Sequence, residues 1–294
     1  MHLEWNAAEQ FSTLVVWSSR TALEWPVCNF NPFSSTIRQS KGSSVSKEVI
    51  SSGERFSIQA YARTGGLLYL LIIVIGVVGE AFIRASLVVP GDAAATAQRI
   101  LGGAVLWRVG IAAQLVLLVC AVALSAIWFV LLRPVHRNLA VAVVCFGLVS
   151  LAVESLCALQ LQAALDPLTS PALAQVASKE QLQAMSYLAV VSHGRAFGVA
   201  LVFFGVQCLL VGYLVRKSGF FPSALGVAMQ VVGACYLLNS FAMFAHPPLQ
   251  DMLFPAILLP AFLGESAMCL WLLLKGVDVP KWNGGPYLVA DKVQ

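Results

Sequence analysis

Ionisable and amide side chains interrupt the long apolar stretches of this chain, and seven of them are our candidates for residues that do chemistry. A charged group in hydrocarbon is expensive, so it usually has a partner or a function. Three carboxylates, two guanidiniums and one imidazole form a nearly neutral set when one proton is shared, and a low-dielectric site favours such a set. The candidates for this polar cluster are Glu80, Arg108, Glu154, His193, Arg195, Asn239 and Glu265.

Carboxylates and an imidazole are metal ligands, and His193, Glu154 and Glu265 are the weak candidates for that role. A metal held there, with Glu80 nearby, would activate a water molecule for attack on a lipid-like substrate. The chain contains no HxxxH or HExxH spacing and no Cys-x-x-Cys pair, the patterns typical of such sites. We therefore expect no metal and no cofactor, and an intramembrane metal-dependent hydrolase is an alternative function.

Two other functions fit the same residues. In a proton-coupled carrier of a small solute, Glu154 or Glu265 would take up and release the proton while Arg108 or Arg195 holds an anion. In a structural protein, the two arginines simply neutralise the carboxylates and lock the helices together. We favour a non-enzymatic role, either structural or in binding a small ligand or lipid, with membrane lipids as partners.

The composition determines the kind of fold that positions these groups. Of the 294 residues, 59% are hydrophobic and only 11% are charged, with a mean hydropathy of +0.82. A soluble domain of this length needs far more polar surface. The net charge of +4 is small and spread over loops, so we expect no nucleic-acid partner. The sequence predicts an all-α, polytopic membrane protein.

About 20 apolar residues are needed for each membrane crossing, and the chain supplies six such stretches. A short surface helix over Ala93–Leu101 should begin after Asp92 as its N-cap and end before Gly102 and Gly103. Six of the seven polar residues then lie toward one end of the bundle, with Glu265 near the middle. The predicted crossings are Arg63–Phe82, Ala104–Leu132, Leu139–Ala163, Ser192–Leu214, Ser223–Phe244 and Leu253–Leu274.

The basic residues in short loops predict the orientation of the bundle. Arg133 and Arg137 join the second and third crossings, and Arg216 and Lys217 join the fourth and fifth. Both termini are therefore expected on the cytoplasmic side of the inner membrane, and the polar cluster in the outer half. Arg84 and Arg99, in the first outer loop, are exceptions to this distribution.

The domain organisation follows from the same apolar stretches. Residues 1–55 are polar and rich in serine, so we expect a disordered cytoplasmic tail. Residues 56–279 form the predicted membrane domain, and residues 280–294 form a short cytoplasmic tail.

Small residues recur at seven-residue intervals in the fourth and fifth crossings. Such a series lines one face of a helix, and lipid-embedded helices associate through the close backbone approach that small residues allow. We expect these two crossings to pack as a tight hairpin. The residues concerned are Gly198, Gly205 and Gly212 in one helix and Gly226, Gly233 and Ser240 in the other.

Several short motifs between Tyr61 and Val277 resemble those of the bacterial integral membrane proteins grouped as the domain of unknown function 4386 family. The resemblance implies a six-helix membrane protein and supplies no activity. His136 stands where the family pattern implies an asparagine. The motifs include Glu80 to Arg84, Pro90-Gly91-Asp92, Leu106-Trp107-Arg108, Leu132-Arg133-Pro134, Phe203-Phe204-Gly205, Gly212-Tyr213-Leu214, Gly264-Glu265 and Leu270-Trp271-Leu272.

Overall fold

The computed structural model describes residues 57–284, and these residues fold into helices without strands. The predicted all-α membrane bundle is confirmed. The predicted tail over 1–55 lies outside the described residues. Of the predicted tail over 280–294, residues 285–294 also lie outside them, whereas residues 280–283 form part of a short helix. The helices are α2 (Ile58–Val77), the π-helix η1 (Val78–Arg84), α3 (Ala85–Leu87), α4 (Ala93–Gly102), α5 (Ala104–Leu132), α6 (Arg137–Thr169), α7 (Pro171–Val176), α8 (Lys179–Ser218), α9 (Ser223–Ala245), α10 (Pro247–Leu253), α11 (Leu258–Leu274) and α12 (Val279–Asn283).

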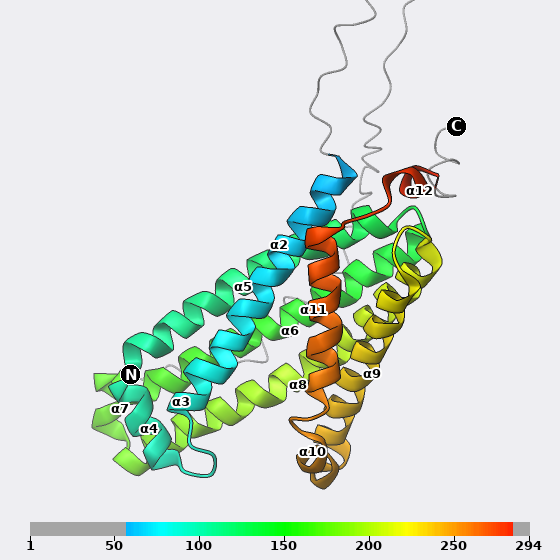
Figure 1. The fold of residues 1–294 in the computed structure, drawn as a ribbon. Helices are drawn as coiled ribbons and strands as arrows, with labels where there is room; N and C mark the ends of the chain where they lie inside the picture. The colour runs from blue at the N-terminus through cyan, green and yellow to red at the C-terminus, as the bar shows by residue number, and fades with distance from the viewer. Residues whose placement is uncertain (1–56, 285–294) are drawn as a thin grey trace, which may run out of the picture. The chain divides into compact units, whose positions relative to one another are not determined.

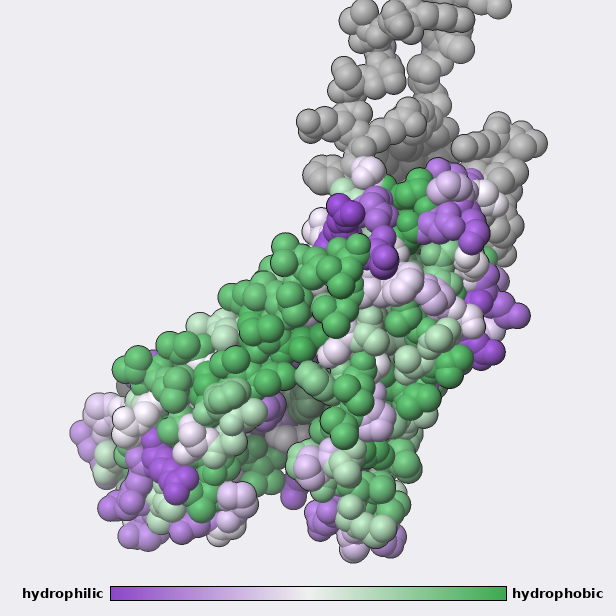
Figure 2. Space-filling view, viewed as in Figure 1, coloured by the Kyte–Doolittle hydropathy of each residue, from purple (hydrophilic) through white to green (hydrophobic). Residues whose placement is uncertain are grey.

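Five continuous helical segments among the described residues are long and apolar enough to cross a membrane. The sixth predicted crossing is a pair of helices, α10 and α11, that meet at 57°. In Figure 2, apolar residues cover the middle of the bundle while hydrophilic residues gather at its ends. This distribution is the one a bilayer requires of a spanning bundle.

Local signals explain where the shorter elements begin and end. The Asp92 carboxylate accepts a hydrogen bond from the Ala95 amide at 2.8 Å and so caps α4. The predicted break at Gly102 and Gly103 is confirmed, because α4 ends at Gly102 and α5 begins at Ala104. Helix α8 starts earlier than predicted, at a capping box formed by Ser178 and Gln181.

The six long helices form a closed ring. Helix α2 packs on α5, α5 on α6, α6 on α8, α8 on α9, α9 on α11, and α11 returns to α2. The ring closes where Gln59 donates a hydrogen bond to the Lys275 carbonyl at 2.6 Å and accepts one from the Val277 amide at 3.1 Å. The start of α2 and α12 therefore share one end of the bundle (Figure 1), which we call the terminal end; α4 and α7 mark the distal end.

Glycines set the distance between α8 and α9. A Cβ atom on Gly212 would lie 2.5 Å from the Gly226 carbonyl oxygen, and one on Gly226 would lie 2.6 Å from the Gly212 oxygen. Gly205 and Gly233 face each other in the same way. Farther along the interface, Gly198 meets the Met243 side chain. The backbones touch here, which only residues without a Cβ atom allow.

Two hydrophobic cores stabilise the ring. The larger core lies toward the terminal end and contains Leu131, Leu214 and Leu272. The smaller core lies toward the distal end, where Trp107 is 2% exposed and donates a hydrogen bond from Nε1 to the Leu161 carbonyl at 2.8 Å. Between these cores the ring is hollow.

Candidate functional site

A cavity of about 360 Å³ occupies the interior of the ring. All six long helices contribute to its wall, which is mostly aliphatic and aromatic. A mostly apolar cavity with a few polar groups is the usual form of a small-molecule site. The polar residues of the wall are Tyr69, Glu80, Arg84, Gln114, Ser125, Ser150, Glu154, Gln207, Tyr236 and Glu265.

The cavity reaches the side of the bundle between α2 and α11. Near the terminal end these helices touch, because Gly66 lies against the Leu273 backbone and Cys269 donates from Sγ to the Gly66 carbonyl at 3.4 Å. Toward the distal end they separate (Figure 1), and Figure 2 shows a hollow at this place. Val77 and Phe262 line the cavity and are 40% and 45% exposed. The opening therefore faces the region where lipid chains would lie.

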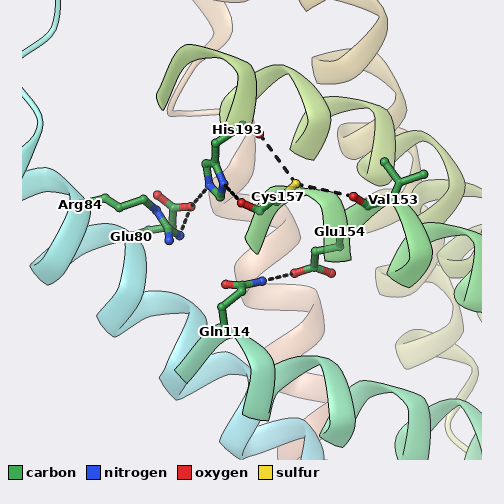
Figure 3. A network of polar contacts seen from close by, with 7 residues as sticks. All are labelled: Glu80, Arg84, Gln114, Val153, Glu154, Cys157 and His193. Carbon is green, nitrogen blue, oxygen red and sulfur yellow. Dashed lines mark hydrogen bonds and ion pairs between the residues drawn. The ribbon is translucent and has the colours of Figure 1, made fainter. Parts of the chain in front are cut away.

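The π-helix η1 places an ion pair at the distal side of the cavity. The Ala85 amide bonds to the Glu80 carbonyl, five residues back, and π-helical turns are often found at functional sites. Arg84 Nη2 contacts Glu80 Oε1 (Figure 3). The Glu80 side chain is 54% exposed, whereas that of Arg84 is 13% exposed.

His193 approaches this pair from α8. Its Nδ1 lies 3.1 Å from the Cys157 carbonyl oxygen of α6, and a carbonyl only accepts, so Nδ1 carries a hydrogen. Its Nε2 lies 4.0 Å from Glu80 Oε1. The imidazole thus connects α6 and α8 to the ion pair of η1 (Figure 3).

Glu154 lines the cavity from α6. Gln114 of α5 donates a hydrogen bond from Nε2 to Glu154 Oε1 at 2.8 Å. Among residues 57–284, no ion pair reaches Glu154. An amide, and not a cation, is therefore its direct partner.

Glu265 lines the cavity from α11 and is 9% exposed. Its Oε1 accepts a hydrogen bond from the Tyr236 hydroxyl of α9. Tyr69 of α2, which also lines the cavity, interacts with the same carboxyl group. Within the described part of the chain, Glu265 has no cationic partner.

Gln207 is a further polar group in the wall. It belongs to α8, is 6% exposed, and lies so close to Gly147 of α6 that a Cβ atom there would be 2.5 Å from Nε2. The structure gives its amide no hydrogen bond to any described residue. Its amide atoms are not among the fully buried polar atoms that lack a partner, so the side chain is free to bond to a ligand in the cavity.

The structure separates the seven sequence candidates. Glu80, Glu154 and Glu265 line the cavity, and His193 contacts Glu80. Asn239 is buried in α9, outside the cavity wall, and its Oδ1 has no partner among the described residues.

Arg108 and Arg195 are exposed, so the structure does not bring them into the cluster. The residues of a helix advance by 100° each, and these two point away from the ring. Arg84 supplies the guanidinium instead. It was expected in a loop because the apolar stretch ends at Phe82, but the helix continues through Arg84 to Leu87.

The weak metal candidates do not form a common site. No group of three or more His, Cys, Asp or Glu side chains in residues 57–284 is arranged to hold a metal ion. Sequence reasoning also overlooked Tyr69, Gln114, Gln207 and Tyr236. The two glutamines are amides inside apolar stretches, the same signal that selected Asn239.

The ring of apolar helices and its internal cavity define a polytopic, all-helical membrane protein with an intramembrane pocket. The chain belongs to the family described as Domain of unknown function (DUF4386), whose model matches residues 64–276. It is also 29% identical over 75 residues to a protein of Archaeoglobus fulgidus whose name is "Uncharacterized protein". That match covers 26% of this chain and 43% of the relative. No solved structure matches the chain.

Proposed function

We propose that the protein binds a small amphipathic molecule that enters its cavity from the membrane through the opening between α2 and α11. The observation that carries this proposal is the cavity itself, about 360 Å³ of mostly apolar wall with polar groups at a few places. Such cavities bind molecules of moderate size. The exposed Val77 and Phe262 at the opening would contact the lipid-embedded part of an entering ligand.

We further propose that the bundle lies in the cell inner membrane with its terminal end in the cytoplasm. Arg133, Arg137, Arg216 and Lys217 are grouped at that end, between α5 and α6 and around the end of α8, and basic residues in short loops favour the cytoplasmic side. In this orientation the distal half of the cavity, with Glu80 and Arg84, lies toward the outer leaflet.

Filling the cavity tests the binding proposal. Gly76 of α2 lines the cavity, and a Cβ atom there meets only Leu117 Cδ1, at 3.9 Å. Gly76→Leu should therefore fold and occupy part of the space. Gly194→Leu is the matched control, because Gly194 is exposed in α8 and a Cβ atom there has no neighbour within 4 Å.

The probe is 4-phenylbutanol, a small amphipathic molecule that fits the cavity. Titration calorimetry on protein in phosphatidylcholine nanodiscs, with empty nanodiscs subtracted, removes the signal of simple partitioning. We expect saturable binding that Gly76→Leu weakens at least tenfold and Gly194→Leu leaves unchanged. Equal binding by both variants would contradict the proposal.

A further inference from the structure

The charges of the cavity wall do not balance. Glu80, Glu154 and Glu265 line the cavity together with one cation, Arg84. Arg84 Nη2 contacts Glu80, which offsets one carboxylate charge, while Arg84 Nε has no partner among the described residues. Glu154 and Glu265 are left with neutral partners among the residues that the structure describes. The wall therefore holds two more carboxyl groups than basic side chains.

Two tyrosines, Tyr236 and Tyr69, interact with Glu265, the more deeply buried of these two acids. Tyr236 bonds to Glu265, and its ring lies 5.5 Å from that of Phe204, centroid to centroid. Tyr69 and Trp128 also line the cavity. Aromatic faces attract cations, so a carboxylate beside several rings offers both an ion pair and cation–π contacts.

We infer that the ligand of this cavity is an organic cation, a protonated amine on an apolar body, whose ammonium group is held by Glu265 and Glu154. The inference rests on the proposed function and assigns its ligand class. The Gln207 amide also lines the cavity, and its carbonyl oxygen can accept a further ammonium hydrogen.

The same geometry disfavours an anionic ligand. A carboxylate or phosphate in the cavity would meet Glu154 and Glu265, while the charge of Arg84 is offset by Glu80. Buried like charges repel strongly because the low-dielectric surroundings screen them little. A bound ammonium instead supplies the charge that the cavity lacks.

A matched series of probes tests the assignment. The three probes, 4-phenylbutylamine, 4-phenylbutanol and 4-phenylbutyrate, share one apolar body and carry a cation, a neutral group and an anion. The binding of each is measured in phosphatidylcholine nanodiscs, which carry no net charge. We expect the amine to bind at least tenfold more tightly than the alcohol, since hydrogen bonds to charged partners are among the stronger ones.

The double variant Glu154→Gln and Glu265→Gln should reduce the preference for the amine to about threefold or less. The double variant Asp251→Asn and Glu180→Gln removes two exposed carboxylates outside the cavity wall, and it should keep the preference. If the double variant Glu154→Gln and Glu265→Gln does not fold, Glu154→Gln alone replaces it. The preference for the amine should then fall by a smaller factor.

The outcomes separate the two proposals. If 4-phenylbutanol binds and Gly76→Leu weakens that binding, but 4-phenylbutylamine binds no more tightly, the inference of a cationic ligand is refuted and the cavity proposal stands. Tightest binding of 4-phenylbutyrate, or a preference for the amine that survives in the cavity variant, also overturns the inference. If none of the three probes binds saturably, both proposals fail.

Discussion

Removing the Arg84 guanidinium tests whether the pair at η1 stabilises the bundle. Arg84→Met keeps an unbranched apolar side chain and deletes the charge, leaving Glu80 with His193 Nε2 at 4.0 Å as its remaining partner. The Arg84 side chain is 13% exposed and that of Glu80 is 54% exposed. The carboxylate thus keeps partial access to its surroundings.

The expected loss lies between two limits. Removing one partner of a fully buried pair costs about 3–5 kcal/mol, whereas an exposed pair contributes about 0–1 kcal/mol. Because one member is half exposed, we expect Arg84→Met to lower the free energy of unfolding by about 2 kcal/mol. For a domain of more than 200 residues, this corresponds to a fall in Tm of about 4–8 °C.

The assay is a thermal ramp of the detergent-solubilised protein, followed by tryptophan fluorescence. Arg108→Met is the matched control and should change Tm by about 1 °C or less, because Arg108 is exposed and outside the cluster. Adding Glu80→Gln to Arg84→Met should restore most of the loss, since no charge is then left without its partner. An equal loss in Arg108→Met, or no restoration in the double variant, would refute the reasoning.

Three further predictions concern packing, ring closure and orientation. Gly212→Leu inserts a side chain where α8 and α9 backbones touch, so it should cost about 1–3 kcal/mol in thermal melts, whereas Gly194→Leu should be nearly neutral. Gln59→Ala removes both hydrogen bonds that join α2 to the end of α11; hydrogen exchange should show faster opening at residues 275–279. In a cysteine-free background, a membrane-impermeant thiol reagent added to intact cells should label Glu180→Cys and spare Lys281→Cys. Labelling of the opposite site would reverse the proposed orientation.

Much of the fold could be predicted because the length of each apolar stretch can be read from the sequence. The break between α4 and α5 was predictable from Gly102 and Gly103, since two adjacent glycines weaken a helix and Asp92 caps the preceding one. The early start of α8 was not predicted. A search for apolar stretches stops at the first polar residues, whereas the helix continues to its capping box at Ser178.

The site was harder to predict because depth along a helix does not show which face a residue occupies. His193 and Arg195 are two positions apart on α8, which turns them about 200° from each other. Once His193 faces the ring, Arg195 must face outward, as its exposure shows. This conflict was present in the sequence. The location of Arg84 was not, because it lies beyond the apolar stretch, in a π-helical segment whose Ile83 is buried in the smaller core.

The contacts of the three glutamates divide the predicted cluster into two parts with different physical roles. Glu80 has a guanidinium within its own helix and an imidazole nearby, so its charge is compensated by the protein, as a structural role requires. Glu154 and Glu265 have only an amide and phenolic hydroxyls. Buried acids without a cation lower stability. A structural role does not account for this cost, whereas a cationic ligand compensates for it.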